Sequence, residues 1–261
     1  MERPGEYVYR RAGDKELKAF VFHPAKEGTK ERKAAIVLFH GGGWSQGKPE
    51  WAFDRARYFA GQGLVAIAVQ YRLSDQKSVT PLEAMEDSRA VIQWIRSGAN
   101  WLGVDPGRIV AYGWSAGGHL AASAAVFADT TAKGIPSSPD ALVLVSPALQ
   151  LEKDGWAKRL VGSRADIASL SPVSHIRKGL PPTLILQGSE DTVTPLEGAR
   201  LFHDRMKAAG NSCDLQVFPN VGHMFTPKGT PDNRLPRPDP KVQALAVEKI
   251  NAFLHDRGFL K

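Results

Sequence analysis

A serine in a sharp glycine-flanked turn is the residue of this sequence best placed to do chemistry. Ser115 lies at the centre of Gly113-Trp114-Ser115-Ala116-Gly117, a G-x-S-x-G pattern. We expect a strand over 108–113 before it and a helix of small residues over 117–126 after it. A strand, a tight turn and a helix in this order expose a serine Oγ and require small residues two positions before and after it. Ser115 is therefore the candidate nucleophile.

Two later loops could supply an acid and a base for this serine. Asp191 follows the apolar strand expected over 183–187, and His223 follows the last expected strand, over 215–218. A carboxylate can hold an imidazole in the orientation in which it accepts a serine proton. The order serine, aspartate, histidine along the chain is the one associated with this kind of turn. Glu190, next to Asp191, is the competing candidate for the acid.

A glycine-rich turn after a buried strand could bind a developing negative charge. The strand expected over 35–39 runs into His40-Gly41-Gly42-Gly43-Trp44. Because glycine has no Cβ, the backbone N–H groups of such a turn can face a ligand. We expect the N–H groups of Gly42, Gly43 and Ala116 to form an oxyanion hole. A phosphate-binding loop is the other interpretation, but no G-K-[ST] follows the glycines.

Two tryptophans flank these candidate residues in the sequence. Trp44 follows the glycines, and Trp114 directly precedes Ser115. Each is a candidate substrate-binding residue, because an indole can stack on a sugar or an aromatic acyl group. Structural packing explains both positions equally well, and the sequence does not decide between the two roles.

The elements that must position these residues follow from the hydrophobic pattern. After two leading strands that we expect to pair antiparallel, strands and helices alternate along the chain. Such alternation predicts a doubly wound, mostly parallel sheet of about eight strands. The expected strands are 7–9, 17–23, 35–39, 64–70, 108–113, 141–145, 183–187 and 215–218, and the expected helices are 51–60, 81–96, 117–126, 196–208 and 241–255.

On these motifs the chain resembles α/β-hydrolases of the esterase and lipase group that carry an H-G-G-G oxyanion motif. The resemblance covers nearly the whole chain, from about Val8 to Leu260. It implies an α/β-hydrolase fold in a single domain over 1–261, ester hydrolysis through an acyl-enzyme, and no metal or organic cofactor. Within the group the chain is similar to small bacterial acetyl esterases and feruloyl esterases. That similarity implies short-chain acyl or hydroxycinnamoyl esters of carbohydrates, including polysaccharides, as substrates.

Two segments bear on the shape of the expected site. In the α/β-hydrolases that the chain resembles, the segment between the sixth and seventh strands commonly covers the site as a cap. Here it spans 147–182, and its pattern predicts only one or two short helices, so we expect a small cap and an open, shallow pocket. The loop 226–240, which follows His223, is either a wall of that pocket or an inert surface loop.

Three other functions remain open on the sequence. An arylformamidase or a small peptidase of the same fold would use the same triad. A catalytically inactive homologue that binds a ligand belongs to a different class, and the presence of all three triad residues argues against it. A comparison of substrates would distinguish an arylformamidase or a small peptidase from an esterase.

Composition restricts the partners. The chain has 261 residues, 43% of them hydrophobic and 23% charged, with a formal net charge of +7. No apolar run approaches the roughly 20 residues of a membrane span, and no basic stripe with interleaved aromatics suggests nucleic acid. No signal peptide is evident, and the sequence leaves the compartment unknown: we expect a cytoplasmic protein as given, or a secreted or periplasmic one if a signal has been removed. The sequence leaves a monomer or a homodimer open.

Overall fold

The computed structural model describes residues 3–25, 31–75, 78–131, 134–230 and 235–261. Within these ranges the chain forms an eight-stranded sheet in the order β1-β2-β4-β3-β5-β6-β7-β8. The pairs β1–β2 and β2–β4 are antiparallel, and every other neighbouring pair is parallel. The strands are β1 (Gly5–Ala12), β2 (Lys15–Phe22), β3 (Lys33–Phe39), β4 (Val65–Val69), β5 (Val104–Trp114), β6 (Ala141–Val145), β7 (Thr183–Gly188) and β8 (Cys213–Phe218). The predicted mostly parallel sheet of about eight strands is confirmed.

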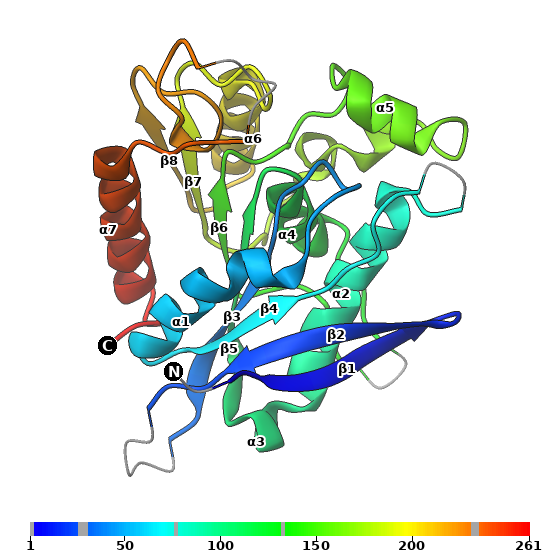
Figure 1. Cartoon of the computed structure of the whole chain (residues 1–261), viewed down its shortest axis with the longest axis vertical. Coiled ribbons are helices and arrows are strands. Elements are labelled where there is room, and N and C mark those ends of the chain that lie inside the picture. The colour runs from blue at the N-terminus through cyan, green and yellow to red at the C-terminus, as the bar shows by residue number, and fades with distance from the viewer. Residues whose placement is uncertain (1–2, 26–30, 76–77, 132–133, 231–234) are drawn as a thin grey trace.

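Helices cover both faces of the sheet (Figure 1). Apolar residues of α1 and α7 pack with one set of strand residues, and those of α2, α4 and α6 pack with the other. The helices are α1 (Phe53–Gly61), α2 (Pro81–Ser97), α3 (Ala99–Leu102), α4 (Ala116–Val126), α5 (Gly155–Val161), α6 (Leu196–Ala208) and α7 (Pro240–Asp256), with 3-10 turns at Pro49–Ala52, Ile167–Leu170, Pro172–His175 and His223–Phe225.

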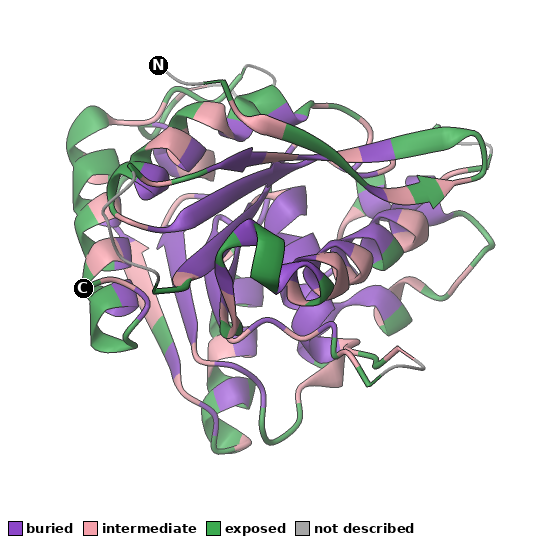
Figure 2. Ribbon diagram, turned by 90° about the horizontal axis from the view of Figure 1, so that it is seen from below, coloured by how far each residue is buried: buried purple, intermediate pink, exposed green. Residues whose placement is uncertain are grey.

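The central strands are apolar along their whole length because both of their faces are covered. In β3, Ile36 and Leu38 belong to the cluster under α1 and α7, while Val37 and Phe39 belong to the cluster under α2 and α4. Side chains alternate between the faces of a strand, so a doubly covered strand has apolar residues at successive positions. Figure 2 shows the buried residues concentrated on the strands in the middle of the molecule.

Local signals in the sequence explain where the helices begin. At α2, the Thr80 side chain accepts a hydrogen bond from Leu82 N, and Glu83 accepts one from Thr80 N, a reciprocal cap that fixes the first turn. At α7, the Asp239 side chain accepts from the N–H groups of Lys241 and Val242. Both helices carry proline at their first residue, where no intrahelical donor is lost.

The segment 147–182 connects the carboxyl end of β6 to the amino end of β7, and its helix α5 lies beyond the carboxyl ends of these strands (Figure 1). It contains α5 and two 3-10 turns, and its buried residues Leu160 and Val161 join the larger core cluster. We call residues 147–182 the cap segment. Sequence reasoning missed several single-turn elements, including the 3-10 turn at His223–Phe225. α3 has only four residues, and the helix expected from residue 51 begins as the 3-10 turn Pro49–Ala52. Single turns carry too few residues to show a periodicity.

Candidate active site

Ser115 lies in a strained turn between β5 and α4. Its φ of 54° and ψ of −124° are values that a non-glycine residue adopts only when its surroundings enforce them. A Cβ on Gly113 would lie against the carbonyl oxygen of Gly117, and a Cβ on Gly117 would lie against the carbonyl oxygens of Phe39 and His40. Only glycines therefore allow α4 to start this close to β3 and β5. The turn leaves Ser115 partly exposed.

The structure brings the three candidate triad residues together. His223 Nε2 lies 3.0 Å from Ser115 Oγ, and His223 Nδ1 lies 3.0 Å from Asp191 Oδ2 and 3.2 Å from Asp191 Oδ1. With a proton on Nδ1 facing the carboxylate, Nε2 is free to accept the hydroxyl proton of Ser115. The imidazole thus connects a nucleophile to a carboxylate in the geometry of general-base activation.

Asp191 is fixed by hydrogen bonds from its own loop. Its carboxylate accepts from Val193 N at 3.0 Å, Thr194 N at 2.8 Å and Gln187 Nε2 at 2.9 Å. Thr194 Oγ1 also lies 2.9 Å from Asp191 Oδ2. The side chain of Asp191 is fully buried. Sequence reasoning missed Gln187 and Thr194, although an aspartate in a loop commonly accepts hydrogen bonds from the backbone a few residues later.

Glu190, the competing acid, faces a different partner. Its carboxylate forms an ion pair with Lys228 Nζ at 2.9 Å, and the hydrogen bond from Lys228 lowers the pKa of Glu190 below its usual value. No hydrogen bond to His223 is among its contacts in the described residues. The geometry therefore favours Asp191 over Glu190 as the partner of the imidazole.

The loop that bears His223 adopts an unusual backbone. Met224 and Phe225 have φ values of 52° and 62°. Met224 N donates to Ser146 Oγ at 3.1 Å, and Gly222 N donates to Thr226 O at 2.7 Å. These bonds hold the tight turn that directs the imidazole toward Ser115.

The expected oxyanion loop packs directly against the nucleophile turn. A Cβ on Gly41 would lie 3.1 Å from Ser115 Cβ. Gly42 and Gly43 have φ values of 118° and 57°, conformations that glycine adopts without strain. Among the described residues, none accepts a hydrogen bond from the N–H of Gly42, Gly43 or Ala116. These three donors remain available for a ligand, and the Ala116 donor lies at the N-terminus of α4, where the helix dipole favours negative charge.

Two buried histidines support this loop from behind. His40 Nδ1 lies 2.7 Å from Gly41 O, and His119 Nε2 lies 3.0 Å from Leu170 O. Burial lowers the pKa of each histidine to about 4, so both are neutral near pH 7. Each has a backbone carbonyl as one of its hydrogen-bond partners, in the loop for His40 and in the cap segment for His119.

The two tryptophans occupy different environments. Trp44 is 2% exposed and its Nε1 donates to His119 Nδ1 at 3.1 Å, so its burial favours packing over the expected contact with substrate. Trp114 is partly exposed, and the Arg55 guanidinium lies 5.6 Å from the centre of its ring. Substrate contact by Trp114 remains a prediction.

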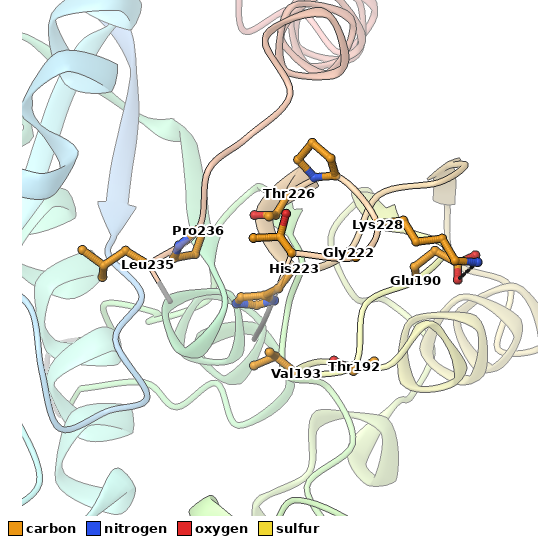
Figure 3. A pocket seen from close by; sticks show the side chains of 12 residues that line it. Glu190, Thr192, Val193, Gly222, His223, Thr226, Lys228, Leu235 and Pro236 are labelled. Carbon is orange, nitrogen blue, oxygen red and sulfur yellow. Dashed lines mark ion pairs between the residues drawn. The ribbon is translucent and has the colours of Figure 1, made fainter. Parts of the chain in front are cut away.

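A cavity of about 390 Å³ opens beside the imidazole. Its lining joins the loop after β7 to the loop after His223, including Val193, Thr226 and Leu235. Figure 3 shows the His223 ring among these side chains, with Val193 and Leu235 on different sides of it and the Lys228–Glu190 ion pair farther away. The loop 226–240 thus forms a wall of the cavity in its described part. Residues 231–234 lie outside the described residues.

A candidate metal site and a candidate membrane-spanning helix are absent from the described part of the chain. No three or more His, Cys, Asp or Glu side chains gather there in a way that could hold a metal ion. In the same residues, no helix combines the length and the apolar character needed to cross a bilayer.

The chain matches a known protein family and is similar in sequence to curated esterases. Residues 36–227 match a family described by the alpha/beta hydrolase fold. Among curated proteins, esterase LipC of Mycobacterium tuberculosis is 26% identical over 254 residues, covering 85% of this chain and 61% of LipC. Carboxylesterase NlhH of the same species is 28% identical, covering 76% of this chain and 68% of NlhH. The chain thus spans about three fifths of the length of LipC.

A solved structure covers nearly all of both chains. The apo form of esterase 2 from Thermogutta terrifontis is 36% identical, with a TM-score of 0.87, and the match covers 100% of this chain and 97% of that one. Other structures of the same esterase, also similar to this chain, have propionate or butyrate bound or are phosphorylated by paraoxon.

Proposed function

The chain belongs to the α/β-hydrolase fold family, and from that premise we propose that it is a serine carboxylesterase that cleaves short-chain acyl esters. Membership agrees with the fold class that the sequence indicates. The observation that carries the proposal is the position of His223, whose two ring nitrogens lie 3.0 Å from Ser115 Oγ and 3.0 Å from Asp191 Oδ2.

The proposed reaction has two halves. His223 Nε2 accepts the Ser115 proton as Oγ attacks the ester carbonyl, and Asp191 stabilises the imidazolium. The N–H groups of Gly42, Gly43 and Ala116 bind the oxyanion of the tetrahedral intermediate. The alcohol leaves with the proton from His223, and a water molecule activated by the same imidazole then releases the acid.

The support for small acyl groups comes from a related solved structure. The cavity beside His223 is lined by neither Ser115 nor the proposed oxyanion donors, so its volume does not set the size of the acyl group. Structures of the related Thermogutta terrifontis esterase hold propionate or butyrate. We propose acyl groups of this size as substrates, with acetyl esters of carbohydrates as the natural class and the larger feruloyl esters as the second candidate.

A matched set of initial rates tests the proposal, with Ser115→Ala as the blank. The set is p-nitrophenyl acetate, butyrate and octanoate, methyl ferulate, acetylated xylan and N-formylkynurenine. We expect acetate and butyrate to be cleaved faster than octanoate, and all cleavage to be lost in the variant.

The remaining substrates distinguish the narrower alternatives. Release of acetate from xylan or of ferulate from its methyl ester would support the carbohydrate class, and failure of both would contradict it. Turnover of N-formylkynurenine alone would make the protein an arylformamidase. No turnover of any ester would contradict the proposed activity and favour a ligand-binding homologue.

A further inference from the structure

Three successive carbonyl groups of the oxyanion loop each receive a hydrogen bond. Gly41 O lies 2.7 Å from His40 Nδ1, and Gly42 O accepts from Gln46 N at 3.0 Å. Gly43 O accepts from Trp156 Nε1 at 2.9 Å. The first two partners belong to the same loop, whereas Trp156 lies 113 residues farther along the chain, in α5 of the cap segment.

Holding a carbonyl also holds the N–H of the next residue, because the peptide unit is planar. The bonds to Gly41 O and Gly42 O therefore orient the N–H groups of Gly42 and Gly43, two of the proposed oxyanion donors. The bond from Trp156 fixes the peptide on the other side of Gly43. Glycine has the broadest backbone freedom of any residue. With both of its flanking peptides held, Gly43 stays at its φ of 57°.

The contact between Gly43 and Trp156 is close as well as polar. A Cβ on Gly43 would lie 3.0 Å from Trp156 Nε1. The position of Trp156 is itself set by the start of α5, where Asp154 Oδ1 accepts from Trp156 N at 2.9 Å. The Arg159 guanidinium lies 5.6 Å from the centre of the indole ring. The tryptophan thus reaches the loop from a capped helix rather than from a loose tail.

A second connection joins the same loop to the cap segment. Trp44, the residue after Gly43, donates through Nε1 to His119 Nδ1 at 3.1 Å, and His119 Nε2 lies 3.0 Å from Leu170 O. Leu170 belongs to the cap segment, like Trp156. A neutral His119 with its proton on Nε2 satisfies both bonds at once. The loop is therefore tied to the cap at two successive residues.

We propose that Trp156 is a positioning residue for the oxyanion hole, and that its indole N–H makes the cap segment part of the machinery that stabilises the tetrahedral intermediate. The proposal rests on the proposed esterase activity. It assigns the cap a role in the chemical step besides that of covering the pocket. A residue that acts in this way changes kcat, because the oxyanion forms after substrate has bound.

The test compares Trp156→Phe with a matched control on the full chain. Phenylalanine keeps an aromatic ring but has no N–H. Trp101→Phe makes the same replacement at a tryptophan 54% exposed elsewhere. For Trp156→Phe we expect kcat for p-nitrophenyl butyrate to fall roughly tenfold, below the 10²- to 10³-fold cost of losing an oxyanion donor outright. KM should stay within about twofold, and the Trp101→Phe control should match the parent.

A second readout isolates the oxyanion. A trifluoromethyl ketone forms a tetrahedral adduct with the serine and places a negative oxygen in the hole, whereas butan-1-ol, a neutral alcohol, has no negative oxygen. Trp156→Phe should weaken inhibition by the ketone about as much as it lowers kcat, and should leave inhibition by butan-1-ol unchanged. Thermal unfolding of the variant should match that of the parent, since Trp156 is 36% exposed.

Other results would overturn the proposal in distinct ways. An unchanged kcat, or a raised KM with kcat intact, would make Trp156 only a wall of the pocket. Equal loss of ketone and butan-1-ol binding, or an equal loss of kcat in Trp101→Phe, would indicate a general structural effect. A parent chain that cleaves no ester would instead refute the esterase activity itself, and with it any role of Trp156 in that activity.

Discussion

The carboxylate of Asp191 lies 3.0 Å from the imidazole of His223 and accepts further hydrogen bonds from three residues, Gln187, Val193 and Thr194. These hydrogen bonds fix the position of the Asp191 carboxylate independently of His223. A carboxylate held in this way can orient the imidazole and stabilise its protonated form without moving during the reaction.

Replacing Asp191 by asparagine should keep the shape of the site but remove the negative charge beside His223. For Asp191→Asn we expect kcat to fall by about 10⁴-fold, because an amide favours the wrong imidazole tautomer. Initial rates with p-nitrophenyl butyrate measure the effect. Glu190→Gln, which breaks only the partly exposed ion pair with Lys228, should change kcat little. A larger loss of kcat in the Glu190 variant than in the Asp191 variant would make Glu190, and not Asp191, the acid of the triad.

Because α4 packs closely against β3, adding a single methyl group at Gly117 should destabilise the fold strongly. In Gly117→Ala the new Cβ would lie against the carbonyl oxygens of Phe39 and His40, which cannot move without disturbing the sheet. We expect the free energy of unfolding to fall by roughly 3 kcal/mol or more, as for overpacked cores, in urea titrations.

Gly61→Ala is the matched control for that variant. Gly61 is the last residue of α1, and a Cβ there meets nothing within 4 Å. It should stabilise the protein by about 0.4–1 kcal/mol, since alanine restricts the unfolded chain. Equal stabilities of the two variants would show that α4 does not need a glycine at its start.

The sequence alone was sufficient for the elements that carry long patterns. β6 and α6 have the expected bounds, 141–145 and 196–208, because apolar runs and helical periodicity mark them clearly. The strand before Ser115 starts earlier than expected, at Val104, since Asp105 and Pro106 do not read as strand residues. The three triad residues lie together because parallel strands carry them to one edge of the sheet.

The supporting contacts could not be found in this way. The bond between Trp156 and Gly43 joins residues 113 positions apart through a cap whose placement no local pattern fixes. The sequence also could not separate Trp44 from Trp114. Both border a glycine-containing turn, and only the direction of each side chain buries one and leaves the other partly exposed.

The buried neutral histidines predict a weakening of the fold in acid. Burial lowers the pKa of His119 to about 4 in the folded protein, whereas the unfolded value is about 6.5. Between these values the unfolded chain binds a proton that the folded chain does not, so stability falls as pH falls from about 6.5 toward 4. Urea titrations at pH 7 and pH 4 give the drop in the free energy of unfolding between the two pH values. In His119→Gln this drop should be smaller than in the parent by up to roughly 3 kcal/mol. An identical pH dependence in the variant and the parent would contradict the assignment of this effect to His119.

The most direct test of the account is the site of covalent modification by paraoxon, which phosphorylates the related Thermogutta terrifontis esterase. Intact-mass and peptide analysis should find one diethylphosphoryl group, on Ser115, with parallel loss of p-nitrophenyl butyrate hydrolysis. Ser115→Ala should remain unmodified, and His223→Ala should react far more slowly, because its serine lacks a base. Modification at another residue, or an unmodified parent that still hydrolyses the ester, would contradict Ser115 as the nucleophile.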